Sequence, residues 1–67
     1  MSYTDAQLAE AERQIESTLH KLRQVVKTLE AKENPERYKS QLTLVLRRIE
    51  AFTIAVDLIR REQGKVE

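Results

Sequence analysis

Apolar residues recur at seven-residue spacing through both halves of the chain, with a second apolar position inside most intervals. In the first half they are Leu8, Ile15, Leu19, Leu22, Val26 and Leu29. In the second half they are Tyr38, Leu42, Val45, Ile49, Phe52, Val56 and Ile59. One flank of the first series is widened by Ala11, Thr18 and Val25. Heptad spacing lines one face of an α-helix, so the pattern predicts two long amphipathic helices.

Polar signals mark the outer ends of these two helices. Thr4 is followed three residues later by Gln7, the spacing of a capping box, in which the two side chains satisfy free N–H groups of the first turn. We therefore expect the first helix to begin at Asp5. At the far end, we expect Gly64 to close the second helix in the left-handed conformation and residues 65–67 to fray.

The turn between the helices is marked by Asn34 and Pro35. Asn is a good N-cap, and Pro fits the first helical position. Because Pro disfavours helical geometry at the residue before it, the first helix has to stop a few residues earlier. These signals predict helices over about 5–32 and 35–63. So short a connection makes the helices antiparallel neighbours. We therefore expect residues 1–67 to form a single all-α domain, an antiparallel αα-hairpin.

Folding the chain at Asn34 brings the two apolar series into layers. The expected pairs are Leu29 with Tyr38, Val26 with Leu42, Leu22 with Val45, Leu19 with Ile49, Ile15 with Phe52, and Leu8 with Ile59. One layer is discordant, because Glu12 lies opposite Val56, and Arg60 is the expected counter-charge. Two interpretations follow for this layer. Either this end of the bundle is splayed and wet, or Glu12 fixes the register of the helices.

The second helix carries more apolar surface than one neighbouring helix covers. The residues outside its central seam are Leu44, Leu46, Ala51, Ile54, Ala55 and Leu58. A small domain without disulfides gains stability by oligomerising, so we expect a homodimer that forms a four-helix bundle. A monomer with scattered exposed apolar residues and a hetero-oligomer are the alternatives. The expected dimer or partner interface consists of Leu44, Leu46, Arg47, Ala51, Phe52, Ile54, Ala55, Leu58 and Arg61.

Composition supports a helical, non-membrane protein and excludes several other classes. One Gly, one Pro and no Cys among 67 residues are typical of long helices and leave no disulfide framework. The net charge of +1 removes the bulk electrostatic argument for nucleic acid or an anionic membrane. No apolar run is long enough for a transmembrane helix. We expect a cytoplasmic protein, and the initiating Met1 favours a complete gene product.

Residues that carry chemistry are few. Ser17 lies three residues before His20, the only histidine, but no third group orients the pair for nucleophilic catalysis. Glu16 and His20 share a helix face and form half of a metal site, without the Glu-x-x-His spacing of di-iron bundles. Gly64 alone cannot cradle a phosphate. We therefore expect no enzyme activity, no cofactor and no metal.

Two function classes stay open. An apolar strip rimmed by arginine is typical of protein contact surfaces, and Arg47, Ile54 and Arg61 form such an edge on the second helix. The leading interpretation is a protein-interaction module that acts as an adaptor, regulator or assembly subunit. The alternative is a regulator that binds nucleic acid through a basic ridge on the first helix. The residues of that ridge are Arg13, His20, Lys21 and Lys27.

Overall fold

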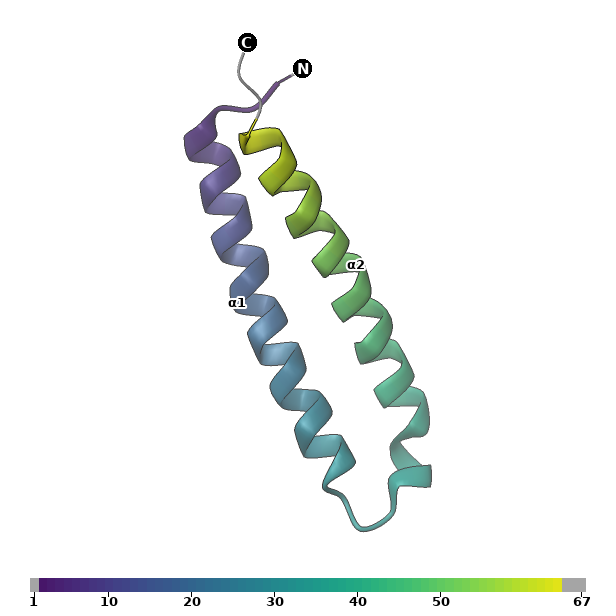
Figure 1. The fold of residues 1–67 in the computed structure, drawn as a ribbon. Helices are drawn as coiled ribbons and strands as arrows, with labels where there is room; N and C mark the ends of the chain where they lie inside the picture. The colour runs from purple at the N-terminus through teal and green to yellow at the C-terminus, as the bar shows by residue number, and fades with distance from the viewer. Residues whose placement is uncertain (1, 65–67) are drawn as a thin grey trace.

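The protein is a helical hairpin. The computed structural model describes residues 2–64 and contains helix α1 (Asp5–Glu30), a short 3₁₀ helix η1 (Pro35–Tyr38) and helix α2 (Lys39–Gln63). The two long helices run antiparallel, side by side, and are joined at one end (Figure 1). The molecule is a rod of 53 × 16 × 15 Å. The all-α antiparallel hairpin expected from the heptads is confirmed.

The capping box at the start of α1 is confirmed. The Thr4 N–H donates to Oε1 of Gln7 at 2.9 Å, and the Gln7 N–H donates to Oγ1 of Thr4 at 3.1 Å. These two bonds satisfy N–H groups that have no partner within the helix. Asp5 is the first helical residue, as the sequence predicts, and its carboxylate lies at the positive end of the helix dipole.

The turn is longer than the sequence indicates. Helix α1 ends at Glu30 rather than Lys32, and the first turn after Asn34 is a 3₁₀ turn, so α2 proper begins at Lys39 rather than Pro35. The Asn34 side chain makes no capping bond; its carbonyl instead accepts from the Arg37 N–H at 3.1 Å. The physical reason is the reversal of the chain. Tighter i→i+3 winding satisfies this carbonyl while the backbone turns back along α1.

The end of α2 also differs from the expectation. Gly64 has φ −78° and ψ −6°, in the right-handed helical region, and its N–H donates to the Arg60 carbonyl at 3.2 Å. The prediction of a left-handed Gly64 is therefore wrong, because continuing the right-handed turn satisfies the last carbonyls equally well. The prediction that residues 65–67 fray lies outside the described residues.

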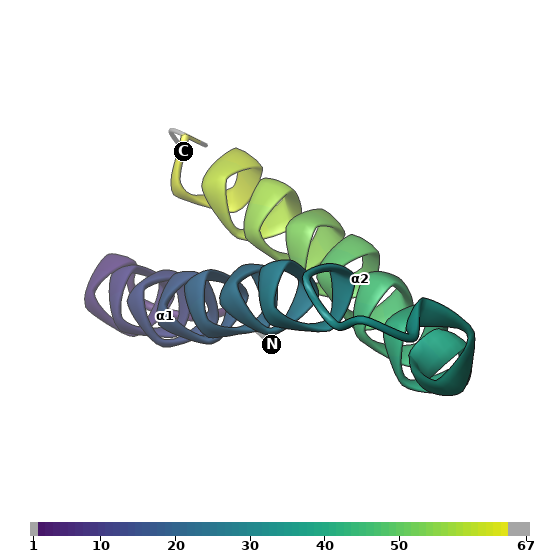
Figure 2. The same cartoon turned by 90° about the horizontal axis from the view of Figure 1, so that it is seen from below.

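The predicted seam forms the core. Within residues 2–64, the buried apolar residues are Leu8, Leu19, Leu29 and Val56. The remaining seam positions, from Ile15 to Ile59, are half-buried. Figure 2 shows that the helix axes are inclined to each other rather than parallel. Two helices touch along a single line, so most seam side chains keep one side open.

Leu19 provides the sharpest test of this seam, because only 4% of its surface is exposed. Leu19→Ala is expected to lower the free energy of unfolding by about 2–4 kcal/mol, since it removes buried methyl groups and leaves a cavity. Urea denaturation at a fixed protein concentration measures the change. Ser17→Ala, on the exposed face of α1, is the control and should shift stability by less than about 0.5 kcal/mol. Equal effects of the two substitutions would contradict the seam.

Candidate interaction surfaces

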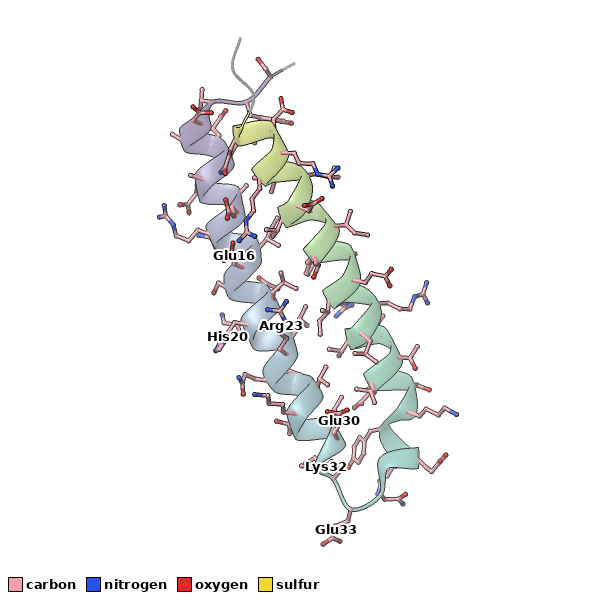
Figure 3. All side chains as sticks on the ribbon, in the orientation of Figure 1. Glu16, His20, Arg23, Glu30, Lys32 and Glu33 are labelled. Atoms are coloured by element: carbon pink, nitrogen blue, oxygen red, sulfur yellow. The ribbon has the colours of Figure 1, made fainter. Side chains whose placement is uncertain are left out.

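The two long sides of the hairpin differ in chemistry. On one side, Glu16, His20 and Arg23 lie on successive turns of α1 (Figure 3). They face Thr53, Asp57 and Arg60 of α2 across a hollow of about 520 Å³, with Leu19 and Val56 at its lining. We call this the polar side. Its charges have both signs, so the hollow presents no net field that would select an anion or a cation.

An ion-pair cluster joins the helices at the end away from the turn. Arg60 Nε donates to Oε2 of Glu12 at 2.8 Å, and Arg60 Nη2 donates to Oε1 of Glu16 at 2.6 Å. The predicted counter-charge for Glu12 is confirmed. The hydrogen bond from Arg60 is the main cause that lowers the pKa of the Glu12 carboxyl below its ordinary value. The side chain of Glu12 is 22% exposed and that of Arg60 is 59% exposed, so the cluster is hydrated rather than dry.

The opposite side of the hairpin is largely apolar. Each residue turns an α-helix by about 100°, so residues seven apart stay on one flank. On α1 this flank carries Gln7, Ala11, Gln14, Thr18 and Val25, and on α2 it carries Leu44, Ala51, Ala55 and Leu58. We call these nine residues the apolar side. Two cations share the flank with them, since Lys21 lies seven residues after Gln14 and Arg48 lies seven residues before Ala55.

The apolar side is exposed, and one of its ends is hollow. Val25, Leu44 and Leu58 are 41%, 48% and 57% exposed. Near the end away from the turn lies a hollow of about 390 Å³. Its lining consists of Tyr3, Gln7, Leu8, Ala11 and Ile59. Exposed apolar surface spanning two elements is a feature of contact surfaces, because water leaves it on association.

The other residues of the predicted interface lie elsewhere. Phe52 is half-buried in the seam between the helices. Leu46, 49% exposed, lies on the polar side, about 160° around α2 from Leu44. Ile54, 54% exposed, lies on the outer edge of α2, pointing away from α1. Arg47 and Arg61 flank it there, and we call these three residues the outer edge. The structure thus brings together only part of the predicted set.

The basic ridge on α1 is narrower than the sequence analysis indicates. Arg13, His20 and Lys27 form one column, but Lys21 points about 100° away from His20. Nη1 of Arg13 also pairs with Oε2 of Glu10 at 3.1 Å. Binding of nucleic acid by this ridge stays a prediction.

Residues 2–64 carry neither a cluster of metal-ligating side chains nor a membrane-spanning helix. In this range, His, Cys, Asp and Glu side chains do not gather in threes as a metal site requires. No helix in it combines the length and hydropathy needed to cross a bilayer.

Comparison with known proteins gives no relative to argue from. No family model, curated protein or solved structure matches the chain significantly. The proposed function therefore rests on the chemistry of the surfaces.

The contribution of α1 to the apolar side was missing from the predicted interface. Its signal was the seven-residue series of Ala11, Thr18 and Val25, while the hollow at Tyr3 became visible only in three dimensions.

Glu12→Gln tests the ion-pair cluster. Because the pKa of Glu12 is lowered in the folded chain, its ionised form stabilises the fold above the unfolded-state pKa, and this stabilisation is lost as the pH falls through the lowered value. The native chain should be more stable than Glu12→Gln at neutral pH, and the difference should close on acidification below about pH 4. Thermal unfolding across pH 2.5–7 (roughly the carboxyl range) measures this.

The matched control is Glu50→Gln on the exposed surface of α2, whose difference from the native chain should stay small throughout. A constant gap between the native chain and Glu12→Gln at every pH would show that the loss arises from packing and not from the charge.

Proposed function

We propose that this chain is a cytoplasmic, non-enzymatic protein-interaction module that acts as a homodimer in the form of a four-helix bundle. The carrying observation is the apolar side, in which both helices expose apolar residues along the length of the rod. The absence of Cys from the chain is in keeping with a reducing compartment.

Burial of the apolar side by a second copy would contribute a free energy comparable to the stability of the hairpin. Val25, Leu44 and Leu58 are already about half covered within the hairpin, so completing their burial contributes roughly 2–4 kcal/mol per chain. A two-fold dimer gains this contribution in both subunits. The core of a domain this small rarely supplies more than about 3–5 kcal/mol, so the additional burial is comparable to the stability of the hairpin itself. This magnitude supports the proposal that association contributes to the stability of the hairpin.

The outer edge of α2 supports binding of a different protein. Ile54 points away from α1 and lies about 40° around α2 from Leu58, at the border of the apolar side rather than within it. Nη2 of Arg61 pairs with Oδ2 of Asp57 at 3.0 Å, whereas Arg47 has no ion pair within residues 2–64. An apolar anchor flanked by arginines fits a helix or groove that offers an apolar pocket with carboxylates at its rim. In this mechanism Ile54 anchors the partner, and Arg47 and Arg61 orient it.

The first experiment concerns the oligomeric state. Leu58→Asp places a charge on the apolar side and should raise the dimer dissociation constant by about 100-fold or more, since the two-fold repeats the cost of burying it. Leu46→Asp is the matched control: the same change, at a similarly exposed leucine on the polar side, should leave the dimer intact. Sedimentation equilibrium provides the measurement. A native chain that remains a 7.8 kDa species at micromolar concentration would refute the homodimer.

The second experiment concerns the protein partner. Ile54→Asp should leave the sedimentation of the dimer unchanged and abolish recovery of those proteins that co-purify with the native chain from its host. Leu46→Asp should retain them. Quantitative mass spectrometry of the three purifications measures the difference. If Ile54→Asp retains the same proteins as the native chain, the outer edge is not the binding surface.

A further inference from the structure

We infer that the apolar side is occupied by a second copy of this chain whose turn lies at the opposite end of the rod. This inference rests on the proposed homodimer and adds its symmetry, which follows from how large and small residues are distributed along the apolar side. The occupant has to match a surface that carries the large side chains of Val25 and Leu44 toward the turn and a hollow at the end away from the turn.

The series on α2 is symmetric about Ala51. Leu44 and Leu58 lie seven residues before and after it, or about 10 Å on either side along the helix. A two-fold axis that crosses the rod at Ala51 therefore places Leu44 of one chain opposite Leu58 of the other. The small side chain of Ala51 lies on the axis, where the two α2 backbones approach most closely. Such a self-complementary patch is what an isologous interface requires.

The series on α1 is centred at the same level. Thr18 lies 12 residues before the end of α1 at Glu30, and Ala51 lies 12 residues after the start of α2 at Lys39. Both are therefore about 18 Å from the turn-side ends of their helices, and one axis serves both series. On α1 this axis places Val25 of one chain opposite Ala11 of the other, a large side chain against a small one.

The alternative two-fold, along the rod, would put both turns at the same end. It would stack Val25 and Leu44 of both chains in one layer and Ala11 and Leu58 of both chains in another. The first layer would be overfilled and the second underfilled, and both faults lower stability in a close-packed core. With the turns at opposite ends, each of these outer layers contains two Leu, one Val and one Ala.

The hollow at the far end supports the same arrangement. Ala11 and Ile59 line it, and it lies at the end of the apolar side away from the turn. A copy with its turn at that end brings its own Val25 and Leu44 over this region, so the full end of one chain covers the hollow end of the other. A copy with the same polarity would place hollow against hollow.

A whole long side of the rod, 53 Å by 16 Å, offers roughly 800 Å², about what each partner buries in a standard stable interface, and the nine residues of the apolar side occupy about 27 Å of its length. Arg48 lies on this face between Leu44 and Ala51, and Lys21 lies at its margin; the aliphatic stems of both can lie along the apolar surface while the charged groups reach water.

This arrangement also places both outer edges on one face of the bundle. Each α2 lies against the other α2, so Ile54 and Arg47 of both chains flank the axis on the same face. A partner bound there contacts two symmetry-related anchors, which the alternative dimer would place on opposite faces. In this dimer geometry, the proposed binding surface for the protein partner is formed by the outer edges of both chains.

The test uses the absence of native Cys from the chain. Glu33→Cys, beside the turn, is spin-labelled and the distance between labels is measured in the dimer. Turns at opposite ends predict about 45 Å, and turns at the same end predict less than about 25 Å. Ala51→Cys should also be linked between chains by a short bis-maleimide to a species of twice 7.8 kDa, whereas Thr53→Cys, on the polar side, should not.

The outcomes separate the two proposals. A long label distance with efficient linking of Ala51→Cys supports the arrangement. A dimer with a short label distance, or with linking at Thr53→Cys and not at Ala51→Cys, overturns the arrangement and leaves the homodimer standing. A labelled chain that sediments as a monomer, in agreement with the unlabelled native chain, overturns both.

Discussion

Two helices contact each other along a line, and a line of contact encloses very little. Within the described hairpin, the apolar residues that are largely removed from water are Leu8, Leu19, Leu29 and Val56, although the seam contains many more. Every other apolar side chain of the seam remains partly open. The stability available to the hairpin alone is therefore small. The chemistry of its two long sides determines on which side further apolar surface can be buried by association.

The two sides solve this problem differently. The polar side is held by Arg60, which joins two carboxylates of α1 across the helix interface and remains hydrated. Such pairs contribute modestly to stability, but they occupy the surface with charges that a second chain would have to desolvate. The apolar side carries uncharged residues on α1 and half-exposed leucines on α2. A second copy is expected on the side where association removes apolar surface and leaves the ion pairs undisturbed.

The same division accounts for the separate role of the outer edge. Ile54 points away from the seam and lies beside the apolar side, four residues before Leu58, so the fold leaves it exposed. In a bundle with turns at opposite ends, dimerisation gathers two outer edges into one surface. The proposed oligomerisation and partner binding would then use neighbouring stripes of α2.

The heptads determined both helices, their antiparallel pairing and the seam, because a 3.6-residue period repeated through the chain is a local property of the sequence. The capping box could be predicted because it depends on local spacing. The pairing of Glu12 with Arg60 could be predicted because it follows from the register of the seam. The turn was less readable, since the 3₁₀ geometry at Pro35–Tyr38 and the right-handed Gly64 depend on small differences between competing backbone bonds.

Tertiary structure alone decided how the exposed residues are grouped. The sequence predicted one interface that contains Leu44, Leu46, Phe52 and Ile54. Helix α2 instead directs these side chains to the apolar side, the polar side, the seam and the outer edge, respectively. The tertiary structure also places Val25 and Ala11 of α1 on the same side of the hairpin as Leu44 and Leu58 of α2, and it leaves a hollow beside Tyr3. The physical reason is that a surface is made by neighbours from different helices, and their relative rotation is fixed only when the seam packs.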